Sequence, residues 1–96
     1  MRKFGRTDAN HAEIREALRG IGASVQDLSA VGGGCPDLLV AKHGINLLLE
    51  VKDGARPPSE RKLTPAQLAW SIKWQGLVHV VTSVKDAIST VEANTK

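Results

Sequence analysis

Two apolar runs of the sequence carry acidic residues that would face one another in a hairpin. The first run begins at Asp37, and the second leads to Glu50. If His43-Gly44 is a two-residue turn, Lys42 pairs with Ile45. Counting back along both strands then places Asp37 opposite Glu50. A symmetric four-residue loop gives the same pairing, whereas a three-residue loop shifts it.

A lysine shares the predicted face of these two acids. Directly opposed residues on paired strands have Cβ atoms about 4.5–5.5 Å apart, and the strand period of two places Lys52 on the face of Glu50. Opposed like charges destabilise a sheet, so Asp37 and Glu50 favour a compensating cation. A hard divalent ion such as Mg²⁺ or Mn²⁺ suits these oxygen ligands, since no His or Cys cluster accompanies them. Two alternatives stay open: Lys52 alone neutralises one carboxylate, or the charged groups are simply solvated.

The elements around these residues follow from periodicity and capping signals. Three helices are predicted, at residues 8–21, from the Thr64 cap to about Gln75, and from the Ser83 cap to about Val91. Four strands are predicted, at residues 23–28, 37–41, 45–52 and 78–82. The hairpin is expected in the middle of the sheet, because the run 47–49 is all leucine and leaves no polar face. The order α-β-β-β-α-β-α predicts an α/β (mixed α+β) domain with a mixed sheet of about four strands flanked by helices.

The composition limits the class of protein. The 96 residues suffice for one small domain, and no apolar run approaches the roughly 18 residues of a membrane span. The single cysteine excludes an internal disulfide framework and a Cys-based zinc site, and it favours a cytoplasmic location. The net charge of +3 permits a polyanionic partner without demonstrating one.

Short motifs in the chain resemble a known enzyme family. The segment Gly34-Cys35-Pro36-Asp37, the apolar hairpin and Glu50-Val51-Lys52 form the pattern Pro-Asp…Glu-X-Lys, which resembles the PD-(D/E)XK nuclease superfamily. The continuation Leu63-Thr64-Pro65-Ala66-Gln67, with Trp70 following, looks like its VRR-NUC branch, including the small stand-alone phage and bacterial members. The resemblance covers nearly the whole chain and implies a restriction-endonuclease-like core of order αβββαβ(α) over residues 1–96.

The resemblance also implies roles for the motif residues. Asp37 and Glu50 would ligate Mg²⁺, with Mn²⁺ as a substitute, and the backbone carbonyl of Val51 would add a further ligand. Lys52 would position or activate the attacking water and stabilise charge on the scissile phosphate. The reaction of the superfamily is in-line hydrolysis of a phosphodiester, leaving 5′-phosphate and 3′-hydroxyl ends. A metal that polarises the phosphoryl oxygen and a nearby cation suit that chemistry.

Two residues on the predicted helices are candidates to complete the site. Glu13 lies beside the apolar stripe of the first helix. Junction-resolving relatives carry a metal-binding acid on this helix, and the alternative for Glu13 is a solvated boundary residue. Gln67 matches the glutamine of the VRR-NUC signature, which lies close to the catalytic lysine. Its alternative is structural, because Thr64-x-x-Gln67 is itself a capping box.

Five further residues are candidates for DNA contact. Gly33 and Gly34, in a run of three glycines, either admit a phosphate backbone or supply the positive-φ geometry of a turn. Arg56, Arg61 and Lys62 follow the strand that ends in the motif lysine. Basic side chains in such loops commonly hold phosphates, and the alternative is that they are only solvated.

These features predict a metal-dependent, structure-specific DNA endonuclease. Four-way (Holliday) junctions are the expected substrate, by resemblance and because a domain this small has no room for a separate sequence-reading module. A homodimer would provide two active sites for symmetric cuts, and Trp70 and Trp74 are interpreted as packing residues of the core or of that dimer interface. The alternatives are another DNA nuclease (a flap, end-processing or nicking activity) and a non-catalytic nucleic-acid-binding module of the same fold. Residues 1–7 are expected to form a flexible basic arm, and no membrane contact is expected.

Overall fold

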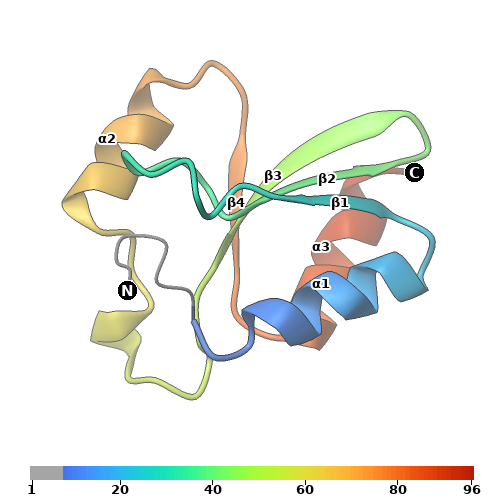
Figure 1. Cartoon of the computed structure of the whole chain (residues 1–96), viewed down its shortest axis with the longest axis horizontal. Coiled ribbons are helices and arrows are strands. Elements are labelled where there is room, and N and C mark those ends of the chain that lie inside the picture. The colour runs from blue at the N-terminus through green and yellow to red at the C-terminus, as the bar shows by residue number, and fades with distance from the viewer. Residues whose placement is uncertain (1–7) are drawn as a thin grey trace.

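The computed structural model describes residues 8–96, and the basic arm predicted at residues 1–7 lies outside the described residues. Along the chain the elements are α1 (His11–Gly20), β1 (Ser24–Asp27), β2 (Leu38–Lys42), β3 (Ile45–Val51), the short 3₁₀ helix η1 (Pro58–Glu60), α2 (Pro65–Lys73), β4 (Val78–Val81) and α3 (Val84–Asn94) (Figure 1). This order confirms the predicted mixed α/β fold. No helix among residues 8–96 is long and apolar enough to cross a membrane.

A four-stranded mixed sheet, in the order β1-β2-β3-β4, organises the chain. The strands β1, β2 and β3 are antiparallel neighbours, whereas β4 runs parallel to β3. The hairpin turn has φ +53° at His43 and φ +78° at Gly44, the pair of left-handed residues that a type I′ turn requires. Lys42 pairs with Ile45, so the predicted register and the central position of the hairpin are confirmed.

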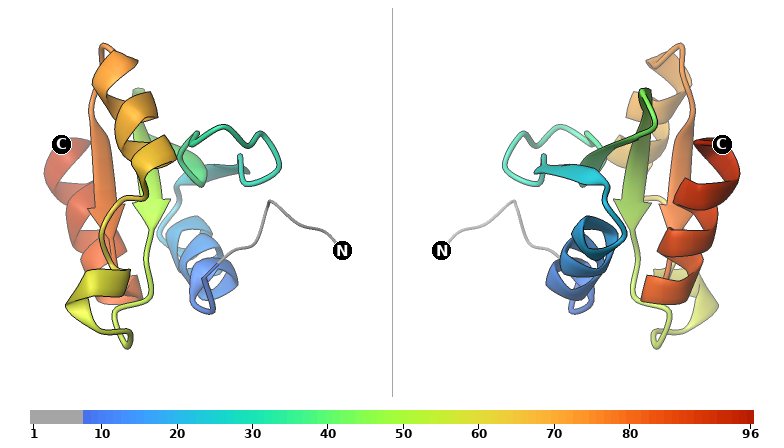
Figure 2. Two further views of the ribbon diagram at one scale, coloured as in Figure 1. Left: turned by 90° about the vertical axis from the view of Figure 1, so that its left-hand side faces the viewer. Right: turned by 90° about the vertical axis from the view of Figure 1, so that its right-hand side faces the viewer.

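The main core lies between one face of the sheet and the helices α1 and α3. Figures 1 and 2 show these two helices on the same side of the strands, with α2 on the other side. The core residues come at helical spacing from α1 and α3 and at alternate positions from the strands: Ile14, Leu18, Ala87, Val91, Leu38, Val40, Leu47, Leu49, Val51 and Val81. Because side chains alternate along a strand, the β3 residues that alternate with these core residues, Leu48 and Glu50, point to the face of α2.

Two helix ends differ from the predicted ones for identifiable reasons. Helix α2 ends at Lys73 rather than at about Gln75, because Trp74 takes an extended backbone with φ −78° and ψ +128°. Helix α3 continues past Val91 to Asn94. The added turn brings Thr95 to a buried position, where its backbone oxygen lies 2.7 Å from Nδ1 of His43 in the hairpin turn. These are tertiary contacts that a local pattern does not encode.

Candidate active site

The ends of β2 and β3 bring the motif acids together. The pairing of Leu38 with Leu49 continues one residue further, which places Asp37 beside Glu50. The backbone N–H of Val51 donates a 2.8 Å hydrogen bond to Oδ2 of Asp37, and this bond fixes the orientation of the Asp37 carboxylate. Glu50 itself is only 3% exposed. The predicted proximity of these two acids therefore exists in the fold.

Lys52 is also buried, an unusual environment for a lysine. Its side chain is 9% exposed, and its Nζ lies 3.8 Å from Oε2 of Glu50. The side-chain amide of Asn10, just before α1, donates to the backbone oxygens of Lys52 and Thr82 at 3.3 and 3.1 Å. The start of α1 is thus tied to the strand end that presents Lys52.

Gln67 connects the acid and the lysine. Its Nε2 donates to Oε2 of Glu50 at 3.0 Å, and its Oε1 accepts from Nζ of Lys52 at 2.8 Å. The same Oε1 accepts from the backbone N–H of Thr64 at 2.8 Å, while the Thr64 hydroxyl oxygen accepts from the N–H of Gln67 at 3.2 Å. The two interpretations of Gln67 are therefore compatible. One side chain completes a capping box at the start of α2 and also contacts both buried charged residues.

The electrostatics of the site are set by burial. Desolvation raises the pKa of Glu50 to about 9, and a hydrogen bond with Asp37 and the negative charge of Asp37 act in the same direction. The positive charge of Lys52 lowers this pKa but does not offset the other effects. These effects favour the protonated form of Glu50 at neutral pH.

This donor set suits a hard divalent cation. Carboxylate oxygens and a backbone carbonyl are the ligands that Mg²⁺ and Mn²⁺ prefer, and a cation would relieve the opposition of Asp37 and Glu50. Within residues 8–96 no three His, Cys, Asp or Glu side chains are arranged as a metal cluster. The fold thus provides two carboxylates and the Val51 carbonyl as candidate ligands, and water would fill the remaining positions.

Glu13 and Asp8 differ in their electrostatic interaction with the site residues. Glu13 is exposed on α1, and it is not among the groups that perturb the pKa of Glu50, so its role as a ligand stays a prediction. Asp8 precedes α1 and has a raised pKa, first because of burial; the positive charge of Lys52 lowers this pKa, and the negative charge of Asp37 raises it. Of these two acids, Asp8 is therefore the one with a recorded electrostatic interaction with Lys52 and Asp37. The sequence offered only its place at the start of the predicted helix.

Of the two candidate glycines, one has a clear structural task. Gly34 has φ +88°, and a Cβ atom there would lie 2.3 Å from the backbone oxygen of Ala66 and 3.0 Å from the nitrogen of Gln67. The glycine loop therefore packs directly on the first turn of α2, the turn that carries Gln67. Gly33 has φ +65°, and a Cβ atom there would meet nothing within 4 Å.

The basic loop after β3 is partly neutralised. Arg56 pairs with Glu60 through an exposed 2.9 Å contact between Nη2 and Oε1. Arg61 is half-buried, and its Nε has no hydrogen-bond partner within the described part of the chain. Lys62 is exposed. Contact of these three residues with DNA stays a prediction.

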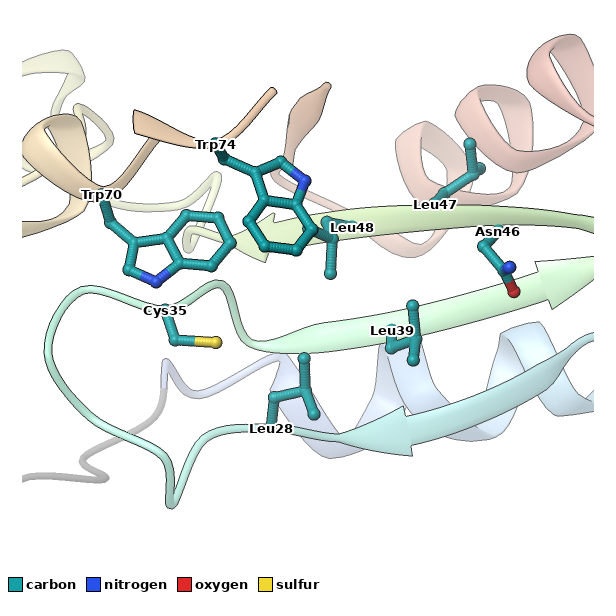
Figure 3. A pocket seen from close by; sticks show the side chains of 8 residues that line it. All are labelled: Leu28, Cys35, Leu39, Asn46, Leu47, Leu48, Trp70 and Trp74. Atoms are coloured by element: carbon teal, nitrogen blue, oxygen red, sulfur yellow. The ribbon is translucent and has the colours of Figure 1, made fainter. Parts of the chain in front are cut away.

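The two tryptophans pack against one another at 4.8 Å between ring centroids and 19° between ring planes, the geometry of an offset stack. They form one wall of a groove of about 410 Å³ on the α2 face of the sheet, which Figure 3 shows from close by. Cys35 also lines this groove, and burial together with the charges of Glu50 and Asp37 raises the pKa of its thiol. The groove therefore begins next to the acids.

Comparisons with known proteins give one informative match. No family model matches the chain, and no curated protein matches it. A solved structure described as "VRR_NUC domain" is 30% identical in sequence and superposes with a TM-score of 0.62. The match covers 93% of this chain and 99% of that structure. The similarity therefore extends over the elements that carry the motif residues.

Proposed function

This chain belongs to the VRR_NUC domain family, and we propose that it is a nuclease that hydrolyses phosphodiester bonds of DNA with the help of a divalent metal ion. The observation that carries the proposal is the joining of two buried ionisable residues by one amide. Gln67 contacts both Glu50 and Lys52, beside the fixed carboxylate of Asp37. Burying ionisable groups in a protein costs free energy, and such groups are concentrated at functional sites. This arrangement therefore favours a functional site.

Asp37, Glu50 and the backbone carbonyl of Val51 would hold the metal. When bound, Mg²⁺ or Mn²⁺ polarises a phosphoryl oxygen and lowers the pKa of a bound water. The hydrogen bond from Val51 N–H orients the Asp37 carboxylate through Oδ2, and a carboxylate has further lone pairs with which to bind a metal. Asp8 adds negative charge at the same end of the sheet and would strengthen the attraction for a cation.

Lys52 would act on the reacting phosphate. Gln67 and Glu50 restrict its Nζ to one position, so the ammonium is preorganised to orient the attacking water and to stabilise developing negative charge. Its burial strengthens that stabilisation, because charges interact more strongly where water is excluded. Gln67 acts through Lys52 and is a positioning residue.

Branched DNA is the proposed substrate, with the four-way junction cleaved symmetrically by a homodimer. The support is the resemblance of the motifs Pro36-Asp37 and Glu50-Val51-Lys52 to those of junction-resolving nucleases. Two copies would supply the paired active sites that symmetric cuts need.

A panel of labelled DNA substrates tests this function. We expect cleavage of a four-way junction in the presence of Mg²⁺ or Mn²⁺, as paired symmetric cuts, and its loss in Asp37→Asn and Glu50→Gln. Glu92→Gln, on the exposed surface of α3, is the matched control and should cleave normally. Cuts confined to flaps, ends or single strands would overturn the junction assignment. Binding of DNA without metal-dependent cleavage of any substrate would overturn the enzyme and identify a binding module.

A further inference from the structure

One side chain, that of Asn10, joins the start of α1 to the end of the sheet that carries Lys52. Its Nδ2 donates to the backbone oxygen of Lys52 at 3.3 Å and to that of Thr82 at 3.1 Å. These two residues directly follow the parallel strands β3 and β4, whose ends lie beside the start of α1 in Figure 1. The contacts span 42 and 72 positions of the chain. Asn10 therefore fixes three distant segments relative to one another.

The usual local role of an asparagine at a helix start does not account for Asn10. Asparagine is preferred at the N-cap because its side-chain oxygen accepts a hydrogen bond from an N–H of the first helical turn. Asn10 is the N-cap residue of α1, yet its side chain makes no such bond to the described helix. Among residues 8–96, its buried Oδ1 has no hydrogen-bond partner at all. The side chain is turned instead toward the strand ends, where two carbonyl oxygens can only accept and the amide must present its NH₂ group.

The two strand ends need a donor because the regular ladder stops here. Strand β4 ends at Val81, and the chain then turns into α3. The last backbone bonds between the two segments run from Lys52 N–H to the Val81 oxygen at 2.9 Å and from Gly54 N–H to the Thr82 oxygen at 3.0 Å. A Cβ atom at Gly54 would lie 2.7 Å from that Thr82 oxygen, so the chain after Lys52 packs directly on it. A carbonyl removed from water needs a donor, and Asn10 supplies one to the Lys52 oxygen.

We propose that Asn10 is a positioning residue for Lys52. Gln67 and Glu50 hold the Nζ of this lysine, and Asn10 holds its backbone, so the side chain is fixed at both ends. Misplacing a reacting group by about 1 Å can slow a reaction on the order of 10²-fold. Loss of the Asn10 contacts should therefore slow cleavage and leave DNA affinity unchanged, because Asn10 places the lysine and does not itself bind the substrate. This role rests on the proposed function.

The variant Asn10→Leu tests the role, because leucine keeps the branched shape of asparagine and has no donor. Since the Asn10 side chain does not cap α1, the substitution removes no helix cap. Asn94→Leu is the matched control: the Nδ2 of Asn94 also donates to a backbone oxygen, that of Thr90 at 2.7 Å, on the exposed surface of α3. If Asn10→Leu fails to fold by circular dichroism, Asn10→Ala removes the same donors from this partly exposed position.

Two measurements are made on each folded variant. The single-turnover cleavage rate of a labelled four-way junction with Mg²⁺ should fall roughly 10- to 100-fold in Asn10→Leu, while its Kd for the same junction without Mg²⁺ stays at the wild-type value. Hydrogen exchange without DNA should show faster exchange of the Lys52 and Gly54 amides relative to the other amides of β3, because local opening exposes only the segment that has lost its contacts.

The outcomes separate a positioning role from a purely structural one. Slower cleavage at unchanged DNA affinity, with faster exchange confined to Lys52 and Gly54, supports the proposal when Asn94→Leu behaves as the wild type. A folded Asn10→Leu that cleaves at the wild-type rate overturns it. Faster exchange throughout β3 also overturns it, because it indicates a general loss of stability. A wild type that cleaves no DNA is the distinct failure of the proposed function, and it overturns the positioning role as well.

Discussion

The two faces of the sheet are built by the same strands but differ in what covers them and in the residues they carry. On the face of α1 and α3, Leu49 and Val51 are almost completely buried among aliphatic residues. On the face of α2, Leu48 borders an open groove, and Glu50 and Lys52 are buried with each other and with Gln67. The seven-residue strand β3 and the residue that follows it thus place core residues on one side and the candidate site on the other, because side chains alternate along a strand.

The largest expected effect is on the free energy of unfolding, when one of two adjacent leucines on opposite faces of the sheet is shortened. Leu49→Ala removes a fully buried side chain from the core and should lower the free energy of unfolding by about 2–5 kcal/mol. Leu48→Ala, beside the groove, should cost about half as much, since its cavity is open to solvent or relaxes. Urea denaturation of both variants measures the difference. Equal losses would contradict the view that only one face is a closed core.

The contact of the glycine loop with α2 allows a second comparison. Gly34→Ala adds a Cβ atom that would collide with the backbone of Ala66, and it should destabilise the fold by about 1–3 kcal/mol while displacing Gln67 and slowing cleavage. Gly33→Ala carries the same strain of a positive φ but meets no atom. Cleavage rates of folded samples should therefore fall more in Gly34→Ala than in Gly33→Ala. Similar rates in both variants would show that the loop does not position α2.

The last expected effect concerns stability without metal. The raised pKa of Glu50, about 9 against 4.5 when unfolded, means that the folded state binds a proton which the unfolded state releases. Stability should therefore fall as pH rises between these two values. Glu50→Gln removes this linkage, so without divalent ions it should raise Tm relative to the wild type more at pH 8 than at pH 5. Thermal unfolding at pH 5 and pH 8 measures it. A wild-type Tm that rises with pH in this window would contradict the buried, protonated Glu50.

Much of this arrangement can be predicted from the sequence, for definite reasons. The turn at His43-Gly44 permits only a few registers, and the register alone brings Asp37 to Glu50. The Thr64 cap determines where α2 begins, and so which residue of its first turn is Gln67. Local chemistry was sufficient for these features.

Other features have no signal in the local sequence pattern that would predict them. The nearness of Asp8 to Lys52 arises because the segment before α1 returns to the end of β3, where Asn10 contacts Lys52. The early end of α2 follows from the conformation of Trp74. The pairing of Arg56 with Glu60 across η1 depends on a short 3₁₀ turn without its own periodic signal.

The most direct test of the proposed nuclease site is a single-turnover cleavage rate, measured on a labelled four-way junction with Mg²⁺. The rates of the wild type, Lys52→Ala and the control Lys85→Ala are compared. Lys85 is exposed on α3, far from the motif in sequence. If Lys52 stabilises the charge that develops on the phosphate, its removal should slow cleavage by roughly 10²–10³-fold or more, while Lys85→Ala cleaves at the wild-type rate. Cleavage by Lys52→Ala at the wild-type rate, or no cleavage by the wild type, would contradict the account.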